Sequence, residues 1–241
     1  MPVRNFRLIR IPIRRLLVPP GLNMSSATIS ELDVVYPESD GKPMADNTLQ
    51  WEWMVLIVEE LREQFAGQEV FVAGDLLWYP VEGQSRINAA PDAMVVFGRP
   101  AGHRKSYIQH SEDGLAPQVV FEVLSASYTD EELDAKLEFY ERYGVEEYYV
   151  IDPAEHLVNA YVRRGARLNP IRKLTGFVSL RLGLRFEWID GGLIIIGKSG
   201  RRFQKRLDRV EDLLENLGEE RRQKLRLAAK LRELGIDPEK L

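Results

Sequence analysis

Apolar residues recur along the chain with two different spacings, which predict helices and strands in a mixed order. Spacings of three and four positions over residues 47–65 predict a helix that is capped by Asp46 or Asn47 and ended by Gly67. The apolar stripe of this helix is expected to consist of Leu49, Trp53, Leu56, Leu61 and Phe65.

Short apolar runs bounded by turn residues predict strands. The run at 119–124 is almost continuously apolar, as expected of a central strand that is covered on both faces. A second helix is predicted from about residue 130 to 143, with Gly144 at its C-terminal cap, and a polar loop over 98–117. The predicted strands cover residues 70–73, 76–81, 87–97, 119–124, 148–151, 157–163, 186–188 and 194–196, the last two joined by a hairpin turn at 190–192. This order predicts an α/β (α+β) fold with a mixed sheet flanked by helices.

The two ends of the chain differ from its middle. Residues 1–30, rich in arginine and proline at the start, predict an arm or flexible N-terminal extension. Met24 has the surroundings of a natural protein start, so residues 1–23 are interpreted as an upstream extension. Residues 31–200 are expected to form the folded domain, and residues 201–241 a charged C-terminal helix.

Apolar residues in the C-terminal segment alternate four and three positions apart, which is heptad spacing. Gly218 is expected to break this phase, and each run is shorter than the three to four heptads that define a coiled coil. The helix is therefore expected either to pack on its own domain or to contact a partner, including a second copy in a homodimer. The first run consists of Phe203, Leu207, Val210, Leu214 and Leu217, and the second of Leu227, Leu231 and Leu234.

The composition restricts the chemistry that the chain can perform. It contains no cysteine, which excludes disulfides, thiolate metal sites and cysteine nucleophiles. His103, His110 and His156 lack ligand spacing, so a metal would be held by carboxylates and would be a hard cation. No apolar run approaches the ~18 residues that span a membrane, and the first twenty residues lack a secretory core. A cytoplasmic location is expected.

Charge is distributed unevenly along the chain, whose net charge is −4. Residues 1–20 carry +5, and residues 201–241, with twelve basic and nine acidic side chains, carry +3. The sixteen basic and twenty-eight acidic side chains between them sum to −12. A module that binds nucleic acid by charge alone has the opposite sign. Any nuclease function must therefore depend on a local site, with metal ions offsetting the acidity.

Two charged residues occupy positions where the pattern calls for apolar ones. Glu122 lies inside the apolar strand, where a carboxylate is costly to bury unless it is paired or binds a metal. Lys136 falls on the apolar face of the following helix, together with Leu137 and Tyr140, and points toward the sheet. Asp92, in the strand predicted before this one, is a candidate only in combination with these two residues. Two acids and a lysine could bind one or two Mg²⁺ and stabilise the charge that develops in phosphodiester hydrolysis.

Four segments of the chain are similar to a known family. They are Pro91-Asp92, residues 121–125 (FEVLS), residues 136–140 (KLEFY) and residues 143–153 (YGVEEYYVIDP). Together they resemble the Uma-two family of restriction endonucleases, which belongs to the PD-(D/E)xK nuclease-like superfamily. The resemblance covers roughly residues 36–200, and the last segment is the most specific.

The resemblance implies a restriction-endonuclease-like core and a metal-dependent endonuclease acting on DNA with Mg²⁺ or Mn²⁺. It implies that Asp92, Glu122 and Lys136 are catalytic, and that Asp92, Glu122 and the Val123 carbonyl bind the metal. The superfamily pattern places lysine two residues after the second acid, where this chain has Leu124. The family resembled here has this lysine on the following helix, where Lys136 stands. Asp75 and Glu52 are further candidates to complete the metal shell.

Two other functions stay open at this point. The first is a catalytically inactive nuclease-fold module that binds nucleic acid or a protein partner, which the −12 charge of the middle segment favours. The second is a structural partner protein that acts through the C-terminal helix.

Overall fold

The computed structural model describes residues 34–41 and 43–233. The predicted N-terminal arm up to residue 30, the start at Met24 and the end of the C-terminal segment lie outside the described residues. The helices are α1 (Thr48–Gln64), α2 (Asp130–Arg142), α3 (Arg206–Glu233) and the 3₁₀ turn η1 (Gln109–Glu112). The strands are β1 (Val70–Ala73), β2 (Trp78–Tyr79), β3 (Ala93–Phe97), β4 (Tyr107–Ile108), β5 (Val119–Val123), β6 (Glu147–Asp152), β7 (Leu157–Arg164), β8 (Arg167–Pro170), β9 (Arg185–Ile189) and β10 (Gly192–Ile196).

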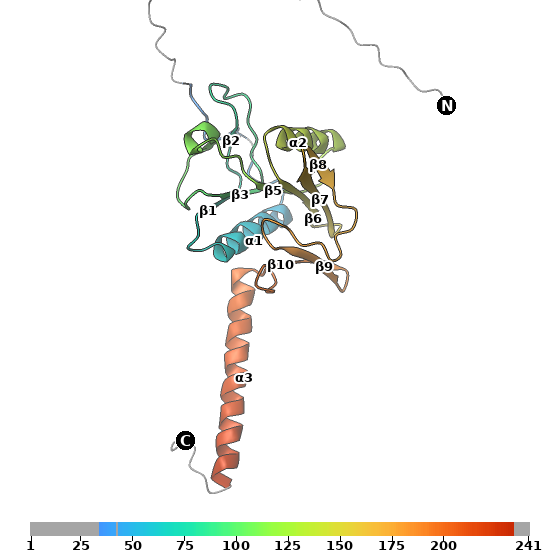
Figure 1. Ribbon diagram of the computed structural model, residues 1–241. Coiled ribbons are helices and arrows are strands. Elements are labelled where there is room, and N and C mark those ends of the chain that lie inside the picture. The colour runs from blue at the N-terminus through green and yellow to red at the C-terminus, as the bar shows by residue number, and fades with distance from the viewer. Residues whose placement is uncertain (1–33, 42, 234–241) are drawn as a thin grey trace, which may run out of the picture. The chain divides into compact units, whose positions relative to one another are not determined.

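A mixed sheet forms the centre of the domain (Figure 1). Six of the described strands form this sheet, in the order β1-β3-β5-β6-β7-β8. Only β5 and β6 pair in parallel within this sheet, and the connection between them is α2. The remaining neighbours pair antiparallel. All five residues of β5 are buried, as the continuous apolar run predicted, and the mixed α/β fold class is confirmed.

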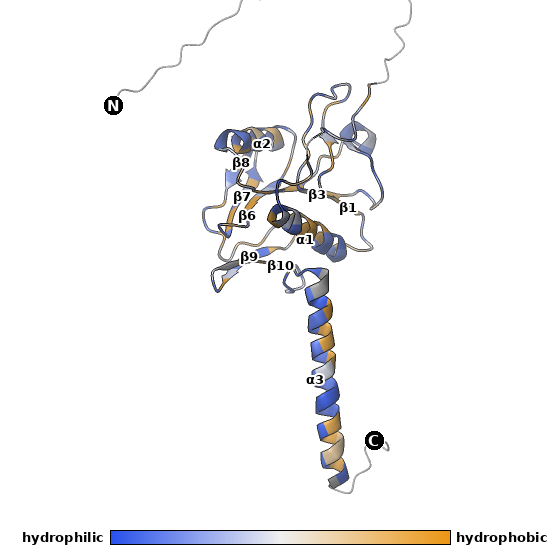
Figure 2. Cartoon of the chain, turned by 180° about the vertical axis from the view of Figure 1, so that it is seen from behind, coloured by the Kyte–Doolittle hydropathy of each residue, from blue (hydrophilic) through white to orange (hydrophobic). Residues whose placement is uncertain are grey.

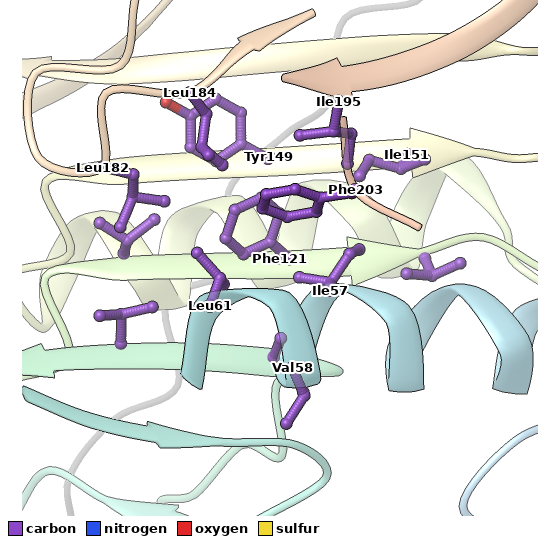
Figure 3. Packing of buried hydrophobic residues seen from close by; sticks show 14 of the residues in the cluster. Ile57, Val58, Leu61, Phe121, Tyr149, Ile151, Leu182, Leu184, Ile195 and Phe203 are labelled. Carbon is purple, nitrogen blue, oxygen red and sulfur yellow. The ribbon is translucent and has the colours of Figure 1, made fainter. Parts of the chain in front are cut away.

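Helix α1 covers one face of the sheet. Asn47 caps it by accepting a hydrogen bond from the Gln50 backbone N–H, as predicted. The predicted stripe is partly wrong, because Leu49 is 40% exposed. The buried residues of the helix lie on the same side as Gln50, mostly at successive spacings of three and four positions. Leu49 lies about 100° around the helix from Gln50. The buried apolar residues of the helix are Met54, Ile57, Val58 and Leu61, which belong to one core cluster with Phe121 and Tyr149 of the sheet. Figure 3 shows Ile57 and Leu61 beside Phe121.

The opposite face of the sheet is covered by α2 and by a small parallel pair of strands, β2 and β4. Strand β4 and the turn η1 fall within the segment predicted as a polar loop, so that prediction is wrong there. Tyr107 of β4 is fully buried, and its hydroxyl donates to the Leu115 carbonyl at 2.8 Å. A two-residue strand is too short to show a period in the sequence.

The predicted hairpin of β9 and β10 is confirmed, with Asp190 and Gly191 both at positive φ in its two-residue turn. The assignment of Phe203 to the apolar run of the C-terminal helix is wrong, because this residue precedes α3 and packs in the core. Its N–H donates to the Ile195 carbonyl at 2.8 Å. Helix α3 continues through Gly218 without interruption, so the change of heptad phase predicted there occurs within one helix. No helix within the described part of the chain is long and apolar enough to cross a membrane.

Candidate active site

The register of the sheet brings Asp92 and Glu122 together. Ala93 of β3 pairs with Phe121 of β5 in antiparallel register, so Asp92, one residue before β3, lies opposite Glu122. The Val123 backbone N–H donates to Asp92 Oδ2 at 2.6 Å, which fixes the side chain of the acid against β5. Asp92 is 6% exposed and Glu122 is fully buried. Two carboxylates therefore lie side by side at the end of neighbouring strands, largely removed from water.

Glu122 points toward α2. Its neighbours Phe121 and Val123 join the core on the α1 side, whereas the carboxylate turns to the other face. Lys136 Nζ donates to Glu122 Oε2 at 2.5 Å, and the Tyr140 hydroxyl donates to Oε1. Lys136 and Tyr140 are four positions apart and so lie on the same face of α2. The prediction that Lys136 reaches the sheet that holds Glu122 is thus met by the geometry.

Tyr128 completes the surroundings of this ion pair. Its hydroxyl lies 2.9 Å from Lys136 Nζ, from which it accepts, and 3.3 Å from Glu122 Oε2, to which it donates. The ammonium also lies 4.9 Å from the centre of the Tyr128 ring, within range of a cation–π interaction. Thr129 follows directly and forms a capping box with Glu132, which holds the first turn of α2 in place. The loop before α2 and the helix itself therefore position Lys136 together.

The site carries more negative than positive charge. Burial, and next the nearby Glu122 carboxylate, raise the pKa of Asp92 from its ordinary value to about 8. The Val123 N–H and the Lys136 ammonium act in the opposite direction without cancelling this rise. Burial is also the main cause that raises the pKa of Asp75 to about 6, followed by Asp40 and Glu122. One lysine thus stands among several carboxylates, an arrangement that favours an additional cation or protonation of an acid.

Asp75 lies beside the two acids at the end of β1. Its N–H donates to the Pro91 carbonyl at 3.0 Å, and its backbone adopts a left-handed conformation with φ of 46°. Gly74 permits this close approach, because a Cβ there would lie 3.1 Å from the Asp92 carbonyl oxygen and 2.9 Å from Val58 Cγ2. The structure therefore places Asp75 near the pair formed by Asp92 and Glu122.

Glu52 does not belong to this group. It is exposed on α1 and pairs with Lys205 Nζ at 2.7 Å. Its seven-residue spacing from Glu59 places both on the outer side of the helix, where both are exposed. A role in a shared metal shell would require Glu52 to leave that ion pair.

Gln50 is a residue of the site that the sequence reasoning missed. Its side-chain amide donates to the Val123 carbonyl at 2.9 Å and accepts from the Asp46 N–H at 2.8 Å. A carbonyl oxygen has two lone pairs, so this bond leaves one free for a further ligand. The available signal was position, because Gln50 precedes Met54 by four residues on the buried face of α1. A polar residue in that line needs a partner.

The oxygen atoms of Asp92, Glu122 and the Val123 carbonyl are of the type that hard divalent cations take as ligands. Among the described residues, no group of three or more histidines, aspartates and glutamates is arranged to hold a metal. Mg²⁺ is commonly bound by one or two carboxylates, and water and substrate oxygens complete its shell. Asp92 and Glu122 can provide the carboxylates, and the Val123 carbonyl a further oxygen. The buried hydroxyl of Tyr148 has no hydrogen-bond partner among the described residues. Burial first, and then the Glu122 carboxylate, raise the pKa of this hydroxyl.

A family model and a solved structure are similar to the chain. The model of the Uma2 family, described as "Putative restriction endonuclease", matches residues 42–184, more than half of the chain. The chain is also similar to a crystal structure of "a putative nuclease belonging to DUF820" from Anabaena variabilis ATCC 29413. That match has 14% sequence identity and a TM-score of 0.44, and covers 58% of this chain and 75% of the other. No curated protein matches the chain. Through the match over residues 42–184, the chain belongs to the Uma2 family.

Proposed function

We propose that this protein is a metal-dependent endonuclease that hydrolyses phosphodiester bonds of DNA, with Asp92, Glu122 and Lys136 as its catalytic residues. The observation that carries the proposal is the contact of 2.5 Å between the Lys136 ammonium and the buried Glu122 carboxylate, with Asp92 opposite Glu122 in the sheet. Membership of a family of restriction-endonuclease-like proteins supports the reaction class.

Asp92, Glu122 and the Val123 carbonyl are the proposed ligands of Mg²⁺ or Mn²⁺. A bound cation of this kind supplies a water of lowered pKa and stabilises charge on the phosphate oxygens. Burial of Asp92 with its raised pKa supports the assignment, because a cation compensates a carboxylate that is otherwise costly to ionise. The carbonyl contributes through the lone pair that Gln50 leaves free.

Lys136 is proposed to act on the substrate side of the site. Its side chain is 27% exposed, whereas the Glu122 side chain is fully covered, so the ammonium is the part of the pair that a phosphate can approach. A fixed positive charge there stabilises negative charge that grows on the scissile phosphate. Tyr140 and Tyr128 hold the Glu122 carboxylate and Lys136 in this geometry through their hydroxyls. These tyrosines are positioning residues in the proposal.

Cleavage of supercoiled plasmid in the presence of Mg²⁺ or Mn²⁺ tests the proposal. Asp92→Asn, Glu122→Gln and Lys136→Met are each expected to lower the rate by about a hundredfold or more. Asp152→Asn, at the end of β6, and Lys205→Met, the exposed partner of Glu52, are matched controls that should cut like the unchanged protein. Intact plasmid with both metals, or cutting that survives all site substitutions, would overturn the proposal.

The alternative is a nuclease-fold module that binds nucleic acid or a protein without cutting. It is favoured by the −12 charge of residues 21–200 and by the hydrogen bonds that already engage both oxygens of Glu122. Retention on a DNA column without cleavage would support this alternative. DNA as the substrate and the cytoplasmic location stay predictions.

A further inference from the structure

Helix α3 carries a row of large apolar side chains that face solvent. Their exposed fractions are far above those of the core residues. Hydrophobic residues recur along the length of the helix between hydrophilic ones (Figure 2). Exposed large apolar side chains gathered on one element mark an interaction site in a folded protein. The exposed residues are Val210, Leu213, Leu214, Leu217, Leu225 and Leu227, with fractions of 47% to 64%.

The domain holds only the beginning of α3. Arg209 pairs with Glu60 and Glu63 of α1, and Asp212 accepts from the Gln204 side chain at 2.9 Å. Within the described part of the chain, no hydrogen bond or ion pair joins residues 213–233 to the domain. Most helical stability in proteins comes from packing of an apolar face, so the remainder of α3 lacks its usual source of stability.

Charge along α3 is segregated by sign. Residues 206–220 contain six acidic and two basic side chains, a net charge of −4. Residues 221–233 contain six basic and one acidic side chain, a net charge of +5. A parallel pair of such helices would place like charges together, whereas an antiparallel pair places each acidic half beside a basic half.

We infer that α3 pairs antiparallel with α3 of a second copy of this chain. The two halves of the helix have opposite net charge. A two-fold axis at the middle of α3 therefore places an acidic half against a basic half on both sides of the axis. Leu214 and Leu225 lie equally far from the middle of Arg206–Glu233, so the pairing brings each against the other in the partner. Gly218, near the same point, offers no side chain to hold the helices apart. This inference is independent of the proposed cleavage reaction.

Oligomeric state and charge reversal test the inference on the full chain. Sedimentation equilibrium is expected to show a dimer at micromolar concentration. Glu211→Lys with Glu215→Lys, or Lys224→Glu with Arg232→Glu, should each weaken dimerisation by roughly tenfold or more, because like charges then meet. All four substitutions in one chain should restore the dimer. A monomer for the unchanged chain, or a dimer indifferent to both reversals, would overturn the inference.

Orientation is tested with engineered cysteines, since the chain contains no cysteine of its own. A mixture of the Leu214→Cys and Leu225→Cys chains should form an intermolecular disulfide under mild oxidation. Each variant alone should remain largely uncrosslinked, because its cysteine faces leucine in the partner. Efficient crosslinking of Leu214→Cys with itself would indicate a parallel pair and would contradict the antiparallel arrangement. Circular dichroism of every variant checks that α3 remains helical.

Discussion

Lys136 and Glu122 meet at 2.5 Å although they are fourteen positions apart and belong to different layers of the fold. Glu122 has no exposed surface, so the ammonium, together with the hydroxyls of Tyr140 and Tyr128, provides the compensation that a buried carboxylate requires. The pair therefore connects folding of the domain to the chemistry proposed for it. A change at either residue should affect both.

Removal of the ammonium alone should be more damaging than removal of both charges. Lys136→Met leaves Glu122 buried and unpaired, which is expected to lower the free energy of unfolding by roughly 3 kcal/mol. Glu122→Gln in addition removes the uncompensated charge and should recover most of that loss. Urea denaturation of the two single variants and the double variant measures the coupling. Additive effects of the two substitutions would show that the pair does not interact in solution.

Stability should respond to pH through Asp92. Its pKa in the folded protein is about 8, above its ordinary value of 3.8, so the folded state holds the proton more tightly than the unfolded state. The associated stability is complete below about pH 4 and is lost as the pH rises to about 8. The free energy of unfolding of Asp92→Asn should therefore rise relative to that of the unchanged protein, by up to about 1.4 kcal/mol per pH unit across that window.

Thermal unfolding of both proteins at a series of pH values checks this. The difference between the two isolates Asp92, because the other titrating groups are shared. Asp152→Asn is a suitable control, since that carboxylate is part-exposed and accepts from the Ala154 N–H in a turn. A constant difference between Asp92→Asn and the unchanged protein from pH 4 to 8 would contradict the raised pKa.

Periodicity predicted the order of elements well because each signal is local. The cap at Asn47, the central strand β5 and the hairpin after β9 all depend on residues within a few positions of one another. Glu122 and Lys136 were also visible, because each is a charge at a position where the local pattern requires an apolar residue. The side of the sheet on which they meet follows from strand and helix geometry alone.

Glu60 shows what such reasoning cannot reach. It is 2% exposed although it lies on an amphipathic helix among other acids, and its partners Arg201 and Arg209 come from more than 140 positions away. Phe203 was misassigned for the same reason, since its place in the core depends on β10. Pairings of this range depend on how the whole chain packs and leave no trace in a window of a few turns.

Two tyrosines near Glu122 should respond differently to loss of the hydroxyl. Tyr140→Phe removes a hydrogen bond to a buried carboxylate and should cost about 1.5–3 kcal/mol of unfolding free energy. Tyr148→Phe removes a buried hydroxyl that has no partner in the described part of the chain, and should leave stability unchanged or raise it. Chemical denaturation of both variants gives the comparison. Equal losses at the two positions would mean that the Tyr148 hydroxyl is satisfied in solution.

Binding of a divalent cation should depend on pH in the direction set by Asp92. A carboxylate ligand must lose its proton before it binds a metal, so each cation that binds below about pH 8 should release a proton from this site. Calorimetry with Mg²⁺ or Mn²⁺ in buffers of different ionisation enthalpy is expected to show affinity that rises from pH 6 to about 8 and then levels off. Asp92→Asn should abolish both the affinity gain and the proton release, while Lys205→Met should preserve them. Tight binding that is independent of pH, or that survives in Asp92→Asn, would place the cation elsewhere on the chain.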